Sequence, residues 1–259
     1  MTGSGPDVAM DILVCVKRVP MVGGRIVVTA DGQDVDTRMS GFTVSPHEEC
    51  AVEEAVQIVE REGGRVTVLT LGPPEAADQL RDMLALGAQQ AMLLETDGRE
   101  WGPVATAAAI ADAVRELPGD LLLFGNEAAD TGGYQVGIRV AHALGRPVAT
   151  GIKQLARTHG GFQASREYRG VRETYGLPLP AVVSVKEGIN LPRYPSLPGR
   201  LRARRAAIEV SRPAWHPEGL RKRGLRVPAQ ARKRAEVLGS GVDAVPALVA
   251  LLDELGVLS

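Results

Sequence analysis

The residues best suited to bind a ligand form a glycine-rich stretch, Gly125–Gly133, with the sequence GNEAADTGG. Glycine lets a backbone approach a bound molecule closely, and the free amides at a helix N-terminus favour phosphate. Asp130 is suited to accept a hydrogen bond from a ribose hydroxyl, or to cap a helix that begins near Tyr134 and has Gln135 in its first turn. The stretch has neither a Walker-type GK[ST] ending nor a GxGxxG motif. Two interpretations therefore stand: a nucleotide-binding loop, or a structural turn between a strand and a helix.

Groups capable of catalysis or metal binding are scattered along the chain. The four histidines have no metal-ligand spacing. Cys15 stands at the end of a predicted strand, where a buried and unreactive thiol is expected. The acidic side chains Glu48, Glu49, Glu53 and Glu54 are expected to form a solvated or capping helix face. No Ser/His/Asp order, carboxylate pair or lysine motif emerges, so the sequence predicts a binding protein without catalytic residues and without a metal.

Composition indicates an ordinary globular protein. The 259 residues, 44% hydrophobic and 24% charged, suit one large α/β domain with an extension as well as two small domains. No apolar run approaches the ~20 residues that span a bilayer, which predicts no membrane insertion. Residues 1–9 are predicted to be a flexible leader, and either Met1 or Met10 is suited as the natural start. Cys15 and Cys50 have no metal or redox spacing, so we expect reduced thiols in a cytoplasmic protein.

Charge is distributed unevenly behind the net value of −1. Residues 193–234 hold 13 Lys/Arg and 2 Asp/Glu, which makes a basic arm on an acidic body. The arm lacks the interleaved aromatic residues of a base-stacking platform, so nucleic-acid binding is not expected. An acidic partner surface, or the acidic body itself, is the expected contact of this arm.

Alternation of strand and helix patterns predicts a Rossmann-like, doubly wound α/β fold with a mostly parallel sheet. Ser45-Pro46 is a strong helix start, with Ser as N-cap and Pro at the first helical position. In such a sheet, ligands bind beyond the carboxyl ends of the strands, here Cys15–Arg18, Leu71–Pro73 and Gly125–Asp130. The expected strands are 11–17, 65–71, 91–94 and 120–124, and the expected helices are 46–62, 75–86, 103–117 and 133–144.

The pattern changes after Pro147. Antiparallel strands are expected over 148–156, 161–168 and 171–177, and the last strand over 181–186. A short hairpin is expected near 25–32. A final helix over 242–255 carries an apolar stripe that needs a covering surface, either the body of the chain or a partner.

A proline-rich segment, Ile189–Arg205, has the sequence INLPRYPSLPGRLRARR. Its prolines at 192, 195 and 198 predict a stiff, extended connector. One interpretation is a linker between a domain and its tail; the other is an outward-facing loop that docks on another protein through Leu197. The chain beyond Arg205 is too short, basic and aperiodic for a second domain, which favours the docking loop.

Five blocks of this sequence resemble the electron transfer flavoprotein beta-subunit family in order and spacing. The resemblance runs from about residue 10 to 210, and its most specific part is LPAV followed by NLPRYPSLP. The blocks are DILVCVKRV (11–19), SPHEECAVEEAV (45–56), LALGA (84–88), DLLLFGNEAADTGGYQVG (120–137) and LPAVVSVKEGINLPRYPSL (179–197).

The resemblance implies a heterodimer with an alpha subunit that holds most of an FAD. It further implies an adenine nucleotide in the beta site, either AMP or, in electron-bifurcating members, a second FAD. By position, residues 125–137 and the loops near them surround this nucleotide, although Ser45 replaces a usual Asn, and Asn126-Glu127 replace Lys-Gln. The nucleotide contacts so implied are Cys15, Ser45, Pro46, His47, Glu48, Leu71, Gly125, Asn126, Ala128, Asp130, Thr131, Gly132, Gly133, Gln135, Val136 and Gly137.

The same resemblance implies two protein contact regions. Arg166 and Glu167 match an Arg-Glu pair at the subunit interface near the flavin. Electrons would pass from flavoprotein dehydrogenases to a quinone reductase or another acceptor. Residues 10–205 would form the nucleotide-binding domain, with a recognition loop at 186–200, and 206–259 an arm and helix that pack on the alpha subunit. The residues implied in partner docking are Tyr194, Leu197, Arg202, Arg204 and Arg205.

A different class of function is compatible with the same sheet and glycine-rich loop. It is a stand-alone nucleotide-binding sensor of the universal-stress type, which would bind ATP or AMP without a partner subunit. Such a protein has no use for the proline-rich segment or the arm. Whether the beta site holds AMP or FAD, and whether the protein bifurcates electrons, stays open on the sequence.

Overall fold

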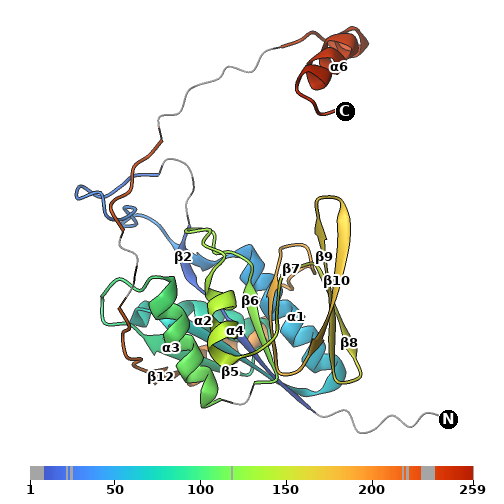
Figure 1. The fold of residues 1–259 in the computed structure, drawn as a ribbon. Helices are drawn as coiled ribbons and strands as arrows, with labels where there is room; N and C mark the ends of the chain where they lie inside the picture. Colours follow the sequence, from blue (N-terminus) through green and yellow to red (C-terminus); the bar gives the residue numbers. More distant parts are fainter. Residues whose placement is uncertain are drawn as a thin grey trace, which may run out of the picture.

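The computed structural model of the chain describes residues 9–21, 23, 26–117, 119–217, 219, 222–228 and 237–258. Almost all of the predicted leader, residues 1–8, lies outside these residues. The centre of the fold is a seven-stranded sheet in the order β12-β5-β4-β1-β6-β11-β7 (Figure 1). Every neighbouring pair in it is parallel, as predicted for a doubly wound fold. The strands are β1 (Met10–Cys15), β4 (Gly64–Gly72), β5 (Gln90–Glu95), β6 (Leu121–Gly125), β7 (Val148–Ile152), β11 (Ala181–Val185) and β12 (Glu209–Ser211).

Helices cover both faces of this sheet. One face carries α1 (Pro46–Glu62), α2 (Ala77–Leu86) with the 3₁₀ turn η1 (Pro74–Ala76) before it, and α5 (Leu197–Arg205), which packs on α2. The other face carries α3 (Pro103–Arg115) and α4 (Val136–Leu144), which contact each other. The sequence therefore predicted the fold class correctly.

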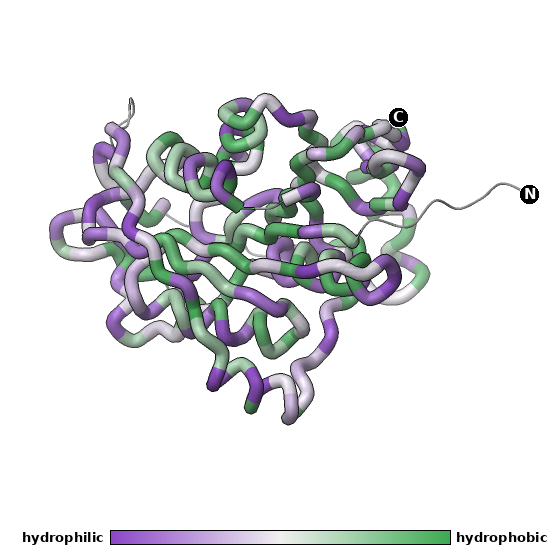
Figure 2. The backbone as a smooth tube through the Cα atoms, turned by 90° about the horizontal axis from the view of Figure 1, so that it is seen from below, coloured by the Kyte–Doolittle hydropathy of each residue, from purple (hydrophilic) through white to green (hydrophobic). Residues whose placement is uncertain are grey.

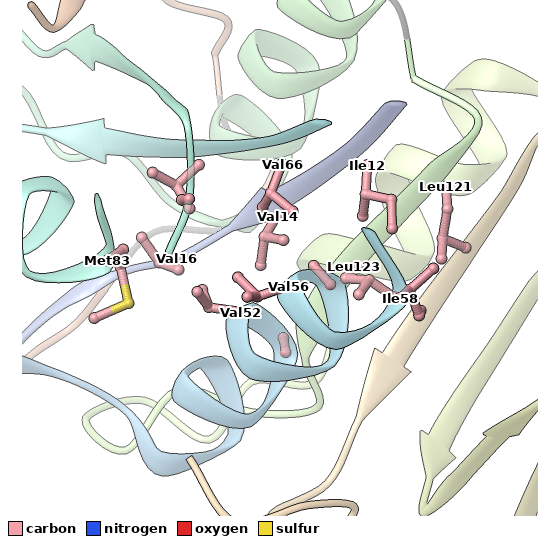
Figure 3. Close-up of a cluster of buried hydrophobic side chains, with 14 of the residues drawn as sticks. Ile12, Val14, Val16, Val52, Val56, Ile58, Val66, Met83, Leu121 and Leu123 are labelled. Carbon is pink, nitrogen blue, oxygen red and sulfur yellow. The ribbon is translucent and has the colours of Figure 1, made fainter. Parts of the chain in front are cut away.

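Alternation along the strands builds a core on each side of the sheet. Ile12 and Val14 of β1 belong to the cluster beneath α1 and α2, whereas Leu13 and Cys15 belong to the cluster beneath α3 and α4. Figure 3 shows Val52 and Val56 of α1 close to Val14 in the first cluster. Hydrophobic segments accordingly gather in the middle of the molecule, with hydrophilic ones on the outer loops (Figure 2).

The predicted strand 148–156 is wrong in one respect, because the structure divides it. The first half is β7, parallel to β11 in the main sheet; Gly151, at φ +71°, lies at a register shift within this pair, which resumes at Ile152 and Val185. The second half is β8 (Gln154–Thr158), which joins β9 (Gly161–Tyr168) and β10 (Val171–Pro178) in an antiparallel sheet of three strands. The interruption falls at Lys153, between two strands whose residue types alone would continue as one.

Other boundaries also differ from the prediction. The strand at 181–185 is not the last, because β12 pairs with the edge strand β5. The helix expected from Gly133 begins at Val136, after Tyr134 takes a positive φ of 55°. Of the hairpin expected near 25–32, Arg25 lies outside the described residues, and Val28 makes an isolated antiparallel bridge with Val35. A short pair, β2 (Arg18–Pro20) and β3 (Phe42–Val44), was not predicted.

The proline-rich segment is only partly an extended connector. Residues 191–196 have no helix or strand, as expected. Leu197, however, begins α5, and the Ser196 hydroxyl accepts a hydrogen bond from the Gly199 amide at 3.1 Å. Pro198 therefore lies in the first helical turn, where a missing backbone donor costs nothing.

The end of the arm forms the expected helix in a shorter version, η2 (Gly241–Ala244) followed by α6 (Val245–Glu254). Apolar side chains of α6, among them Leu248 and Val249, stay exposed in the part of the chain that the structure describes. No helix among the described residues has the length and apolar character needed to cross a membrane.

Candidate functional site

A cavity of about 610 Å³ opens at the carboxyl ends of β1, β4, β5 and β6. The chain runs from β1 outward to β4 and β5 and then returns to the other side of β1 with β6, so the direction of winding reverses here. Cys15 and Phe124 pair across this reversal and both line the cavity. The cavity thus occupies the topological switch point, where ligands of open α/β sheets bind.

Most of the predicted nucleotide contacts meet in this cavity. Eleven of them line it: Cys15, Glu48, Leu71, Gly125, Asn126, Ala128, Thr131, Gly133, Gln135, Val136 and Gly137. Five do not: Ser45, Pro46, His47, Asp130 and Gly132. Three of these five, Ser45, His47 and Asp130, instead make contacts that hold the glycine-rich loop in place.

The glycine-rich loop is fastened at three points. The Ser45 hydroxyl accepts a hydrogen bond from the Ala129 amide at 3.0 Å, and His47 Nε2 lies 3.5 Å from a Glu127 carboxylate oxygen. At the mouth, Lys17 Nζ lies 2.7 Å from both carboxylate oxygens of Asp130. Asp130 is therefore already paired, and its first role here is to fix the loop.

The helix after this loop seats closely on the sheet because of a glycine. A Cβ at Gly137 would lie 2.9 Å from the Ser184 hydroxyl and 3.2 Å from the Phe124 ring. The first turn of α4 therefore approaches the strand ends, and its free amides lie beside the cavity. Gln135 is engaged locally, since its side-chain oxygen accepts from Arg139 at 3.0 Å.

The floor of the cavity holds two buried ionisable side chains. Burial and the neighbouring Glu48 raise the pKa of the Cys15 thiol, so Cys15 is not a thiolate nucleophile. Glu48 is only 6% exposed, and burial raises its pKa to about 7 although the Ser45 and Lys17 amides act in the opposite direction. The carboxylate accepts from the Ser45 amide at 3.1 Å and so also caps α1.

Of the predicted solvated or capping face at residues 48–54, the capping role is found at Glu48, whereas the solvated face is wrong. Glu48, Glu53 and Glu54 are all buried, and only Glu49 remains half-buried on that stretch. Glu53 and Glu54 take their partners from the proline-rich segment, far along the chain. A local pattern of acids cannot indicate such contacts.

Glu48→Gln is expected to change how stability depends on pH. The folded-state pKa of about 7 lies above the ordinary 4.5, so the stability that this group contributes is complete below pH 4.5 and lost as pH rises through 7. Glutamine keeps an acceptor for the Ser45 amide but never ionises. The variant should therefore gain up to about 3 kcal/mol over the native chain between pH 5 and pH 8.

Urea unfolding of both proteins at pH 5 and pH 8 measures this gain. An equal difference at both pH values would show that Glu48 does not titrate in this range.

The sequence missed one wall of the cavity. It is the loop after β5, with Thr96, Arg99, Glu100, Trp101, Gly102 and Pro103 as lining residues. The three strand ends expected at the site do not include the end of β5, because no glycine-rich pattern marks it. The sequence could have indicated this wall only through the position of the predicted strand 91–94, whose carboxyl end lies at the same edge of the sheet as the other three. Lys17 and Arg18, within the Cys15–Arg18 strand end, also line the cavity.

A second surface is the proline-rich segment, which is exposed at its tip and tied down at its base. Tyr194 is 97% exposed and Leu197 is 72% exposed. The base is anchored on α1, where Arg193 pairs with Glu53 at 2.9 Å and Asn190 donates to Glu54 at 2.9 Å. The segment is therefore positioned, and its apolar tip is available.

The predicted basic residues at the end of α5 are not brought into one site. Arg202 donates to the Leu84 carbonyl at 3.4 Å on neighbouring α2. Arg204 and Arg205 are exposed at the last turn.

The predicted interface pair lies on β9, outside the cavity. Arg166 forms an ion pair with Glu173 at 2.6 Å and donates to the Thr150 carbonyl at 3.3 Å. Glu173 also accepts from the Tyr175 hydroxyl at 2.5 Å. Glu167 is exposed and lies 3.7 Å from Arg172. Arg166 thus braces the small sheet, while Glu167 faces outward.

The arrangement suits a small molecule that carries both apolar and polar groups. Apolar residues such as Leu71 and Val136 line one part of the cavity. Lys17 and Arg99 also line it, and each is paired with a carboxylate, Asp130 and Asp97 respectively. The volume lies within the range of small-molecule sites. In the described residues, no group of three or more His, Cys, Asp or Glu side chains is placed to hold a metal ion.

Comparison with known proteins gives a consistent result. Residues 35–214 match the family model of the electron transfer flavoprotein domain. The chain is 35% identical to electron transfer flavoprotein subunit beta of Bacillus subtilis over 203 residues, which is 77% of this chain and 78% of that protein. It is 32% identical to the human subunit beta over 249 residues, covering 95% of this chain and 97% of the other.

Proposed function

This chain belongs to the electron transfer flavoprotein family, with beta subunits as its relatives, and on that premise we propose that it is the beta subunit of a heterodimeric electron carrier. It would pair with an alpha subunit that holds most of an FAD, and it would bind an adenine nucleotide, AMP or a second FAD, in its own cavity. Electrons would pass from flavoprotein dehydrogenases to a quinone reductase or another acceptor. The cavity at the switch point is the observation that carries the proposal.

The cavity residues fit an adenine nucleotide. The amides of the glycine-rich loop and of the first turn of α4 would hold phosphate, with Lys17 and Arg99 as counter-charges. Leu71 and Val136 would enclose the base or sugar. The flavin supplies the redox chemistry when bound, and this chain's residues contribute binding, positioning and exclusion of water.

Two surfaces would serve protein contacts. The exposed Tyr194 and Leu197 would dock the dehydrogenases, with the charges of Arg202, Arg204 and Arg205 beside them on α5. Arg166 and Glu167 on β9 would face the alpha subunit near the flavin. The domain division is part of the same proposal: a body over 10–205, and an arm over 206–259 whose terminal helix buries its apolar stripe on the alpha subunit.

The test is to co-express this chain with its alpha subunit and to analyse the purified complex. A flavin absorbance spectrum and an adenine nucleotide released on denaturation are expected. One FAD per heterodimer with AMP would indicate a simple carrier, and two FAD a bifurcating one. A complex without a flavin spectrum would contradict the proposal.

Leu197→Ala is expected to weaken reduction by a partner dehydrogenase about tenfold. The exposed leucine side chain would bury apolar area on docking, and alanine would bury much less. Flavin and nucleotide content should stay at native levels. Steady-state reduction of the complex by the dehydrogenase, with absorbance for flavin content, measures both quantities. Parallel loss of flavin and reduction rate would mean that Leu197 is structural.

A further inference from the structure

The loop after β5, residues 96–102, is a wall of the cavity that is held at its two ends. Among the described contacts, the Thr96 amide donates to the Gly72 carbonyl at 2.9 Å, and the Thr106 hydroxyl donates to the Trp101 carbonyl at 3.2 Å. At the second end, Trp101 also packs against the hydrophobic cluster beneath α3 and α4, and the Gly102 carbonyl accepts from the Thr106 amide at 2.9 Å. The middle of the loop has no helix or strand. If such a loop becomes ordered only when the ligand binds, the conformational entropy that the loop loses reduces the affinity for the ligand.

The arm supplies the missing support. Its described residues 209–217 and 222–225, here called the strap, start as β12 on the edge strand β5. Arg212 next pairs with Glu95 at the end of β5 at 2.7 Å. Because β12 pairs with residues near the end of β5, the strap leaves the sheet edge beside the start of the loop.

Two residues of the strap, Trp215 and Lys222, contact the loop itself. The Trp215 indole N–H donates to the Glu100 carbonyl at 3.1 Å, and the Arg99 guanidinium lies 5.6 Å from the centre of the Trp215 ring. Lys222 Nζ lies 3.3 Å from a Glu100 carboxylate oxygen. Arg99 and Glu100 both line the cavity, so the strap holds the outer side of residues whose inner side faces the ligand.

The far end of the strap is also fixed. Lys222 pairs with Asp34 at 3.1 Å, and the Leu225 amide donates to the Gly32 carbonyl at 2.7 Å. The two described parts of the strap are therefore each attached: residues 209–217 contact β5 and the loop, and residues 222–225 contact the loop and residues 32–34. The Lys222 side chain is 27% exposed, but its partners Asp34 and Glu100 are 74% and 60% exposed, so both ion pairs lie at the surface.

We propose that the strap fixes the 96–102 loop as a wall of the nucleotide cavity, with Trp215 and Lys222 as positioning residues that set how long a nucleotide stays bound. The inference rests on the proposed function, since it needs a nucleotide in the cavity. It assigns a role to the part of the arm that precedes α6. Retention of the nucleotide thus depends on a segment that does not line the cavity.

The experiment uses the full heterodimer, purified with its nucleotide. The rate of nucleotide release is measured by repeated desalting and chromatographic quantification of the nucleotide that remains bound. Trp215→Ala and Lys222→Met are each expected to raise that rate roughly tenfold, which corresponds to the loss of one preorganised loop contact. Trp215→Phe keeps the ring beneath Arg99 and loses only the indole donor, so it should lie between Trp215→Ala and the native complex.

Arg226→Ala is the matched control, because Arg226 is an exposed residue of the same arm outside the strap. It should release nucleotide at the native rate, and flavin content should be equal in all variants. Native release rates in both Trp215→Ala and Lys222→Met would overturn the inference. A native heterodimer without any adenine nucleotide would instead refute the proposed function on which it rests.

Discussion

Replacement of Arg193 by alanine is expected to lower the free energy of unfolding by about 3 kcal/mol. The guanidinium contacts two carboxylates of α1, Glu53 at 2.9 and 3.1 Å and Glu60 at 2.6 and 2.9 Å. The Glu53 side chain is only 3% exposed, and burial acts to raise its pKa, yet hydrogen bonds from Arg193 and Gln57 hold that pKa below its usual value. Alanine would leave a buried carboxylate without its cation.

The variant Arg193→Ala/Glu53→Gln separates this effect from loss of packing. It removes the buried Glu53 charge that Arg193→Ala leaves without a cation, so it should recover more than half of the lost free energy of unfolding, measured with urea. Arg193→Lys keeps one charge but cannot bridge both carboxylates in the same fork, and it should be intermediate. If the double variant is no more stable than Arg193→Ala, the charge is not the cause.

Gly125→Ala is expected to remove nucleotide from the purified heterodimer almost completely. A Cβ at this position would lie 2.6 Å from Glu48 Cγ and 3.0 Å from the Glu48 backbone nitrogen. Because the backbone cannot yield as a flexible side chain does, the end of β6 and the first turn of α1 must separate. Overpacking of this kind costs about 1–3 kcal/mol and would open the cavity floor.

Gly176→Ala, on β10 and outside the cavity lining, is the control for an added methyl group. No atom lies within 4 Å of the position of its Cβ, and its backbone has no positive φ. Nucleotide content, measured after denaturation, should be close to native. Equal depletion in both variants would mean that the loss of nucleotide does not come from the close approach of Gly125 to Glu48.

The sequence predicted well what is decided locally. Ser45 as N-cap and Pro46 at the first position mark the start of α1 because capping depends on neighbours within one turn. The alternation of strands and helices was enough to predict the fold class. The glycine-rich loop was enough to predict one side of the cavity. The identity of the ligand and the protein contacts remain proposals, since they rest on resemblance of positions.

What the sequence did not predict depends on distant contacts. Glu53 was expected on a solvated or capping helix face, but it is buried, and Arg193 approaches it from 140 positions along the chain. The wall at Arg99 and Trp101 has no motif of its own and belongs to the cavity only because β5 ends at the same edge as β6. β12 is three residues long, too short to stand out from the irregular stretch around it.

The position of β12 at the sheet edge also has a consequence for biosynthesis. Until Glu209–Ser211 leave the ribosome, β5 is an edge strand with an unpaired row of amides and carbonyls. At roughly 5–20 residues per second, the nascent chain carries that open edge for several seconds. Among the described strands, the last to be translated thus covers Met92–Leu94 of β5 and replaces this edge with a strand of three residues, a length that offers little template for self-association.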